Sequence, residues 1–148
     1  MYVILGGTGH VGRAAAQTVL TAGHDVTVVT RQVVAASEQR HDGVDYAAVD
    51  VNDTDTLRAL FQRAQRVFVL NPPAAVSGNT DVEERKTVCS ILKALRGVAL
   101  EKVVVQSTYG VQPGEHCGDL GVLYELEQGA QALNVPVCIV RAAYYISN

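Results

Sequence analysis

Short runs of apolar, mostly β-branched residues recur along the chain and alternate with segments of helical periodicity. Most positions within each run are apolar without a polar alternation, which is typical of strands buried on both faces of a parallel sheet. Six strands are therefore predicted, over residues 2–5, 25–30, 44–49, 66–70, 102–106 and 137–140.

Four helices are predicted between these strands, because apolar residues recur there at intervals of three and four. The stripes are Val11, Ala14, Ala15, Val19 and Ala22; Leu57, Leu60, Phe61 and Ala64; Val88, Leu92 and Leu95; and Leu120, Leu123, Tyr124, Glu127, Ala130 and Leu133. Gly23 and Gly97 stand where helices should end, and Asn52 and Asp53 offer N-caps. Residues 32–43 fit either a short helix or a loop.

This alternation predicts an α/β fold: a Rossmann-type, doubly wound, mostly parallel six-stranded sheet with helices on both faces. The length of 148 residues fits one domain with its own core, so residues 1–148 are expected to form a single unit. Parallel neighbours in such a sheet require crossover connections, which are almost always right-handed.

Composition narrows the class of partner without choosing an activity. The 12 basic and 15 acidic residues give a net charge of −3, and there is no basic run and no Trp, which argues against a nucleic-acid surface. No apolar stretch approaches the roughly 20 residues of a membrane span, and the first residues lack the basic leader of a secretory signal. Cysteines at 89, 117 and 138 form neither CxxC pairs nor an even set, so reduced thiols and a cytoplasmic location are expected.

The strongest chemical signal is the run GGTGHVG at residues 6–12, which follows the first predicted strand and opens the first predicted helix. Glycines there permit a tight turn, a close approach of phosphate to the backbone, and close packing of helix on strand. The helix N-terminus offers unpaired N–H groups to the phosphates. The residues expected to contact a dinucleotide are Gly6, Thr8, Gly9, His10, Val11 and Gly12. The alternative is a glycine-rich turn without a ligand.

The residue at the end of the second strand should choose the cofactor. An acidic residue there would favour NAD, but the strand ends Val29-Thr30-Arg31. A guanidinium at that position would pair with the 2′-phosphate, so NADP(H) is the preferred cofactor and NAD(H) remains possible. The alternative is a solvated surface arginine.

Two further strand ends are expected to line the same crevice, because ligands bind at the carboxyl ends of strands at the switch point. Asp50 and Val51 follow the third strand, where they could meet the adenine, although Asp50 could equally cap a helix. Asn71 and Pro72 follow the fourth strand, where the prolines would form a stiff wall beside the cofactor, or an ordinary loop.

At this point the sequence resembles the NmrA-like branch of the atypical short-chain dehydrogenase/reductase superfamily. The matching segments are GGTGHVG at 6–12, VTVVTR at 26–31, VFVLNPP at 67–73, VVVQSTYG at 103–110 and VPVCIVRAAYYISN at 135–148. The resemblance implies an NAD(P)-binding Rossmann domain that holds NADP(H) through the glycine loop and Arg31. It also implies a nicotinamide end near Asn71, Pro72, Ser107 and Tyr109.

The chain departs from the family pattern in three places. Leu123 stands where members often carry Lys, and Arg141 is followed by Ala142 rather than Pro. Family chains also continue well past residue 148, so most of the C-terminal substrate-binding portion is expected to be missing here.

The catalytic machinery of this superfamily usually comprises a Tyr, a Lys four residues later that lowers the tyrosine pKa, and a Ser that polarises the carbonyl. Tyr124 is followed by Gln128, which cannot supply a positive charge. Ser107 and Tyr109, at the end of the fifth strand, are the better candidates for catalytic contact with a substrate. Quinones need less proton assistance than ketones, so a quinone or a similar small acceptor is the expected substrate.

Other groups of polar residues give weaker indications of a functional site. The histidines at 10, 24, 41 and 116 lack metal-ligand spacing, so no metal site is expected. The run Glu83-Glu84-Arg85-Lys86 is typical of a solvated helix face. Two hypotheses result: the NADP(H)-binding domain of an NmrA-like NAD(P)H-dependent oxidoreductase, or a non-catalytic redox sensor that binds NAD(P) and acts through a protein partner.

Overall fold

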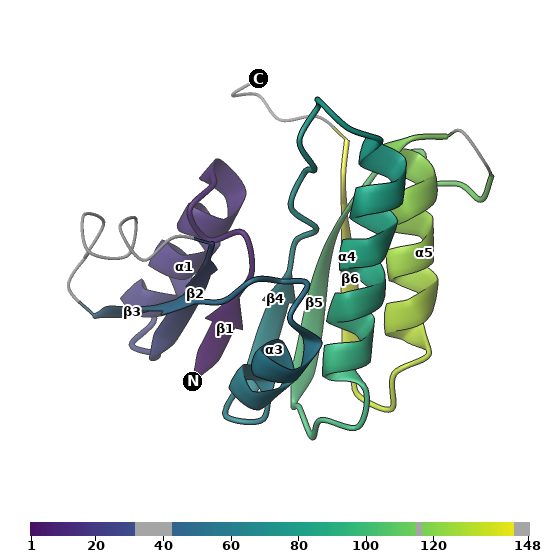
Figure 1. Ribbon diagram of the computed structural model, residues 1–148. Helices are drawn as coiled ribbons and strands as arrows, with labels where there is room; N and C mark the ends of the chain where they lie inside the picture. The colour runs from purple at the N-terminus through teal and green to yellow at the C-terminus, as the bar shows by residue number, and fades with distance from the viewer. Residues whose placement is uncertain (32–42, 115–116, 144–148) are drawn as a thin grey trace.

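The computed structural model describes residues 1–31, 43–114 and 117–143 (Figure 1). Within them the elements are β1 (Tyr2–Ile4), α1 (His10–Thr21), β2 (Val26–Thr30), β3 (Val44–Ala48), α3 (Thr54–Phe61), β4 (Arg66–Val69), α4 (Thr80–Leu95), β5 (Lys102–Thr108), α5 (Asp119–Gln131) and β6 (Val137–Ala142). The predicted fold class is confirmed, with every expected strand present. The helix-or-loop alternative for residues 32–42 falls outside the described residues, as does the end of the family-like segment at 144–148.

The strands form one sheet in the order β3-β2-β1-β4-β5-β6, and all pairs of neighbours are parallel. The chain therefore winds outward from β1 to β3, returns to the centre as β4, and winds outward again to β6. The connections after β1 and after β4 leave the sheet in opposite directions, which opens a crevice at the carboxyl ends of these central strands.

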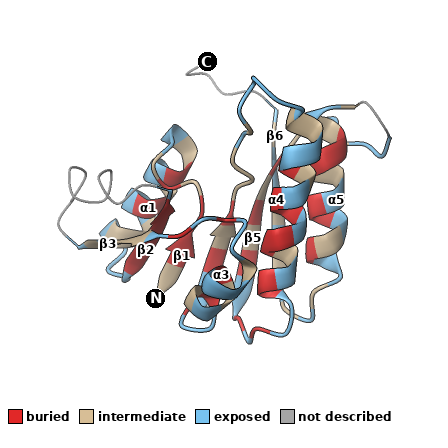
Figure 2. Cartoon of the chain, in the orientation of Figure 1, coloured by how far each residue is buried: buried red, intermediate tan, exposed pale blue. Residues whose placement is uncertain are grey.

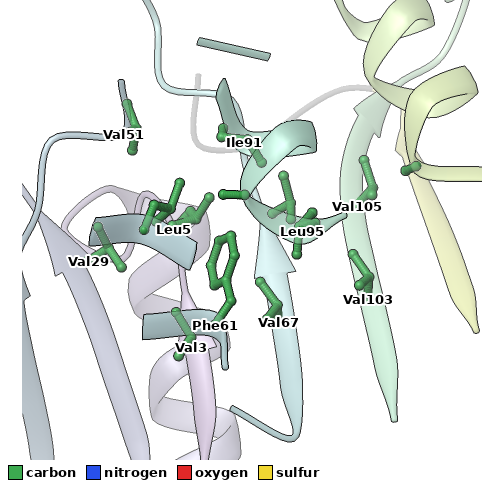
Figure 3. Packing of buried hydrophobic residues seen from close by; sticks show 14 of the residues in the cluster. Val3, Leu5, Val29, Val51, Phe61, Val67, Ile91, Leu95, Val103 and Val105 are labelled. Carbon is green, nitrogen blue, oxygen red and sulfur yellow. The ribbon is translucent and has the colours of Figure 1, made fainter. Parts of the chain in front are cut away.

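The principal core lies between the sheet and the three helices α3, α4 and α5, which lie side by side over one face (Figure 1). Phe61 of α3 and Leu5, just after β1, are fully buried there, beside Ile91 and Leu95 of α4 and Val67 of β4 (Figure 3). On the opposite face α1 packs on β1 and β2 through a smaller cluster that comprises Ile4, Ala16, Val26 and Val28. None of the described helices combines the length and apolar character that crossing a membrane requires.

Among the described strands, burial on both faces is complete only in β2, whereas β4 and β5 bury the face that meets the helices and leave the other face half-buried or exposed. All five residues of β2 are buried, whereas the edge strands β3 and β6 consist of half-buried and exposed positions, because each has a neighbour on one side only (Figure 2). In β5, Val103, Val105 and Ser107 point toward the helices α4 and α5. The register places Ser107 opposite Arg141 of β6, and this pairing sets up one end of the site.

Candidate cofactor-binding site

The loop between β1 and α1 presents an uncapped helix N-terminus. Gly6 has a φ of +65°, and the Gly9 amide donates to the Gly6 carbonyl oxygen at 3.0 Å, which closes a tight turn. α1 begins at His10 with Gly9 as its N-cap, and no side chain caps it. Amides of the first turn have no intrahelical acceptor, and the positive end of the helix dipole points the same way. Such a terminus can bind an anion.

The glycines of this loop are required for two different reasons. A Cβ at Gly7 would lie 2.5 Å from the Val28 side chain, and a Cβ at Gly12 would lie 2.3 Å from the Gly6 carbonyl oxygen, so packing within the protein excludes both. A Cβ at Gly9 would meet only the Gly6 carbonyl oxygen, at an ordinary 3.4 Å. The protein itself has room for a side chain at Gly9, and the glycine keeps the space before the helix open.

A crevice of about 180 Å³ lies beside this loop, at the switch point of the sheet. Its walls come from the glycine loop, the end of β2 and the segments that follow β3 and β4. The lining residues are Gly6, Thr8, Gly9, Val29, Thr30, Arg31, Val49, Val51, Leu70, Pro72 and Pro73. The combination of a mostly apolar wall with a few polar groups is usual for a small-molecule site.

The two charged residues predicted at the strand ends have different surroundings. Arg31 is exposed at the rim of the crevice, and no ion-pair partner for it occurs among the described residues. The Asp50 carboxylate accepts hydrogen bonds from the Asn52 amide at 2.9 Å and from the Asn52 side chain at 3.3 Å. Asp50 therefore shapes the turn before α3, and Val51 rather than Asp50 lines the crevice. Asp53 is the N-cap of α3.

The loop after β4 is fastened to α4. The Glu84 carboxylate accepts a hydrogen bond from the Ala74 amide at 3.0 Å. Glu84 is buried, so the prediction of a solvated helix face with local ion pairs over residues 83–86 is wrong at this residue, although Lys86 and Glu83 do form an ion pair. The anchor holds the segment that carries Pro72 and Pro73 against the crevice.

Two buried polar atoms have no hydrogen-bond partner of normal geometry among the described residues: Asn71 Oδ1 and Ser107 Oγ. Each residue lies two positions beyond the paired Val69 and Val105 of β4 and β5, at the carboxyl end of the sheet. A buried polar atom without a partner costs free energy, so such atoms often mark a place where a ligand binds. Both residues lie outside the 180 Å³ crevice, next to its β4 side.

An ion pair with a buried carboxylate lies beside Ser107. The Glu127 side chain on α5 is completely buried and accepts two hydrogen bonds from Arg141 of β6, from Nε at 2.9 Å and from Nη2 at 2.6 Å. Arg141 lowers the pKa of the Glu127 carboxyl below its usual range, and the nearby Ser107 hydroxyl adds to this effect, while burial opposes it. The same pairing raises the pKa of the Arg141 guanidinium. Glu127 is therefore ionised at neutral pH.

The tyrosines considered for catalysis lie apart. Tyr109 follows β5, its amide donates to the Ala142 carbonyl oxygen at 2.8 Å, and its side chain is largely exposed. Tyr124 is half-buried on α5, where it lines a second cavity. Gln128 is exposed, and Leu123 packs against the principal core, so neither position offers Tyr124 a cation.

That second cavity, of about 690 Å³, lies between the first turns of α4 and α5. Its arginine, Arg85, is held by Asp81 and Glu125. We assign the candidate site to the glycine crevice, because its backbone amides and guanidinium are available. In the described part of the chain, no three His, Cys, Asp or Glu side chains are placed to hold a metal; His41 and His116 lie outside it.

The crevice brings together several of the predicted cofactor residues: Gly6, Thr8, Gly9, Arg31, Val51 and Pro72. His10, Val11 and Gly12 form the first turn of α1, and Asn71 and Ser107 lie toward β5. Pro73 lines the crevice beside Pro72, where the sequence predicts a wall of prolines. Sequence reasoning missed the lining residues Val29, Thr30 and Val49. The sequence could have indicated these residues, since all of them lie at or just beyond the carboxyl end of a predicted strand.

Comparison with protein families gives a match to the model described as NAD(P)H-binding over residues 6–132. The match confirms the nicotinamide-dinucleotide-binding family that the sequence resemblance implied. No curated protein matches the chain.

Several solved structures share the fold. Triphenylmethane reductase of Citrobacter sp., complexed with NADP(H), is 18% identical with a TM-score of 0.84, and the match covers 99% of this chain and 50% of that one. WbmG of Bordetella bronchiseptica, in complex with NAD and UDP, is 17% identical with a TM-score of 0.77, covering 95% and 52%. UDP-glucose 4-epimerase of Thermus thermophilus, in complex with NAD, is 21% identical with a TM-score of 0.70, covering 95% and 54%. The chain thus spans about half the length of these proteins.

Proposed function

This chain belongs to the NAD(P)H-binding family, and from that membership we propose that it is the NADP(H)-binding domain of an NmrA-like NAD(P)H-dependent oxidoreductase that reduces a quinone or a similar small acceptor. The observation that carries the proposal is the open space at Gly9, in front of an uncapped helix N-terminus and beside an exposed guanidinium. Packing within the described part of the protein does not require the open space, the uncapped helix N-terminus and the exposed guanidinium to lie together.

The described residues fit such a cofactor in three ways. The first-turn amides of α1 can bind the diphosphate. The apolar wall that includes Val29, Val51 and Pro72 suits an adenosine. Arg31, at the rim, can pair with a 2′-phosphate through two N–H groups, which supports NADP(H) over NAD(H).

We place the reacting end of the site at the carboxyl ends of β4 and β5, where the two unpartnered buried atoms lie. A bound nicotinamide would supply a hydride there. Asn71 and Ser107 would orient the nicotinamide ring, and Tyr109 would contact the quinone from its exposed position. Because positions 123 and 128 carry no lysine, Tyr124 lacks the usual acid/base partner, which suits an electron-poor quinone better than a ketone.

The same missing lysine favours a second candidate function. A chain that binds NADP(H) in the glycine crevice but lacks a charged acid/base group at positions 123 and 128 could report the redox state of the cofactor to a protein partner without turning it over. The two functions share the binding site and differ only in turnover.

NADPH oxidation separates them. We would follow the absorbance of NADPH in the near ultraviolet with the protein in stoichiometric amount, under anaerobic conditions, against a panel of benzoquinones and naphthoquinones. Oxidation above the rate without protein supports the reductase. Tight binding of NADPH with no oxidation by any quinone would replace the reductase with the sensor, and absence of binding to NADPH and NADH alike would refute both.

A further inference from the structure

Glu127 is a charged residue that the proposed chemistry does not use, yet it is completely buried. Burying an ionised carboxylate is costly unless it is paired and hydrogen-bonded. Arg141 meets that need with two hydrogen bonds in a side-on arrangement. A leucine at this position of α5 would fill the core without such a partner, so the presence of a carboxylate calls for an explanation.

The register of the sheet places this carboxylate next to the candidate reacting end. Ser107 and Arg141 are partners across β5 and β6, and both point toward α5, which carries Glu127. Ser107 is almost fully buried, and its hydroxyl has no hydrogen bond of normal geometry with the described residues. Arg141, the strand partner of Ser107, holds the Glu127 carboxylate on the same side of the sheet as the Ser107 hydroxyl, and that hydroxyl contributes to the lowered pKa of Glu127.

A serine hydroxyl can donate one hydrogen bond and accept two, and its proton rotates to suit its surroundings. A carboxylate only accepts, so a hydroxyl next to Glu127 turns its proton toward the carboxylate and directs its lone pairs elsewhere. We propose that Glu127 is a positioning residue that orients the Ser107 hydroxyl as a hydrogen-bond acceptor for a donor group on the nicotinamide half of NADPH. This inference rests on the proposed function, since it gives Glu127 a task at the nicotinamide end of the proposed site, beside the glycine crevice.

Asn71 places a second hydrogen-bond acceptor beside Ser107, which also favours a donor group on the ligand. Its unpartnered atom, Oδ1, is an acceptor, so β4 and β5 end in two acceptors at one level of the sheet. Amide N–H and ribose O–H groups of NADPH are donors that match them. The expected serine role, which is to polarise a substrate carbonyl, requires a donated proton, and Glu127 withdraws that proton.

A double-mutant cycle tests the inference. We would measure the dissociation constant of NADPH by fluorescence titration for the wild-type chain, Ser107→Ala, Glu127→Gln and the double variant. Each single substitution should weaken binding about 3- to 10-fold, the worth of one hydrogen bond. The double variant should bind no more weakly than the weaker of the two single variants, because Glu127 acts through Ser107. Ser107→Thr, which keeps the hydroxyl, should bind nearly as the wild type does.

Glu125→Gln is the matched control, because it also removes an arginine partner from α5 but its partner is Arg85, away from Ser107. Its affinity for NADPH should not change. Thermal unfolding of every variant separates lost stability from lost affinity. Should Glu127→Gln fail to fold, Glu127→Gln with Arg141→Gln removes the carboxylate without leaving a charge unpaired, and it takes the place of the single variant in the cycle.

The results of these titrations test the role of Glu127 separately from the proposed function. If the wild-type chain binds neither NADPH nor NADH, the proposed function fails. If it binds NADPH and Glu127→Gln has no effect, or if the effects of Ser107→Ala and Glu127→Gln add in full, the function stands and the positioning role of Glu127 is refuted.

Discussion

In the glycine crevice the groups offered to a ligand belong mainly to the backbone, whereas beside it, at the carboxyl ends of β5 and β6, they belong to side chains. The first end consists of the turn at Gly6, the open space at Gly9 and the amides of α1. The second end depends on Ser107 and on the ion pair between the buried Glu127 and Arg141. A backbone site is lost mainly when bulk is added, but a side-chain site is altered by deleting one group. The two ends should therefore fail under different substitutions.

The largest effect is expected from adding bulk at the backbone end. Gly9→Val should weaken binding of both NADPH and NADH more than about 100-fold, because the side chain fills the space that a diphosphate needs. The unfolding midpoint should stay near that of the wild type, since a Cβ at Gly9 makes only an ordinary contact with the protein. Isothermal titration and thermal unfolding measure the two quantities.

Gly78→Val is the matched control for that variant. A Cβ at Gly78 would meet only the Ala75 carbonyl oxygen, at 4.0 Å, and the residue does not line the crevice. It should bind as the wild type does. Dinucleotide binding by Gly9→Val at wild-type affinity would mean that the site lies elsewhere.

A smaller effect on NADPH affinity is expected from Arg31, the charged side chain at the rim of the glycine crevice. Arg31→Ala should weaken NADPH binding by about 1–3 kcal/mol, the worth of a hydrogen bond to a charged group, and should leave NADH nearly unaffected. Parallel titrations with the two cofactors measure the difference. Equal losses for both cofactors would show that Arg31 does not meet the 2′-phosphate.

Glu127, at the side-chain end, should make the stability of the fold depend on pH. Because the folded state lowers the pKa of this carboxyl, its ionisation stabilises the fold above the unfolded pKa of about 4.3, and this contribution is lost as the pH falls through the folded value. Glu127→Gln should cost roughly 1–2 kcal/mol at neutral pH, since Gln keeps a hydrogen bond to Arg141 but loses the charge. The difference from wild type should be fully present above the unfolded pKa and should shrink as the pH falls below about 4.3.

Denaturant unfolding of both chains across this pH range gives the measurement. Asp53, whose pKa is lowered by its hydrogen bonds to Thr56, also loses ionisation in acid, but it does so in both chains and cancels in the difference. A difference that does not change with pH would mean that the charge of Glu127 contributes nothing to stability.

The smallest effect is expected at Tyr124. Tyr124→Phe should leave NADPH affinity and any quinone-dependent oxidation within about twofold of the wild type, because this tyrosine lacks its lysine partner and faces the cavity between α4 and α5. Steady-state oxidation rates provide the test. A loss of turnover beyond about tenfold would return Tyr124 to the catalytic machinery.

The features that the sequence predicts well are local ones. Buried strands appear as continuous apolar runs, and the observed strand ends differ from the predicted ones by at most two residues. The C-terminal glycine of the first helix and the Asp53 cap follow from the same short-range chemistry, with Gly23 at a φ of +79°. The phosphate loop is also local, since its glycines lie within a single short segment that joins a strand to a helix.

The sequence does not predict which contacts individual side chains make in the folded chain. Glu84, in a charged run, is buried and accepts a hydrogen bond from the Ala74 amide. Asp50, at a strand end, turns to Asn52 instead of lining the crevice.

The sequence alone determined the alternation of strands and helices, the uncapped glycine turn and the arginine one strand away, because each rests on hydrophobic period or backbone conformation within a few residues. Only the tertiary structure decided that Ser107 lies opposite Arg141 and that Arg141 reaches Glu127. Strand register and helix packing set those neighbours, and both come from the way the whole core fills, which no short segment specifies.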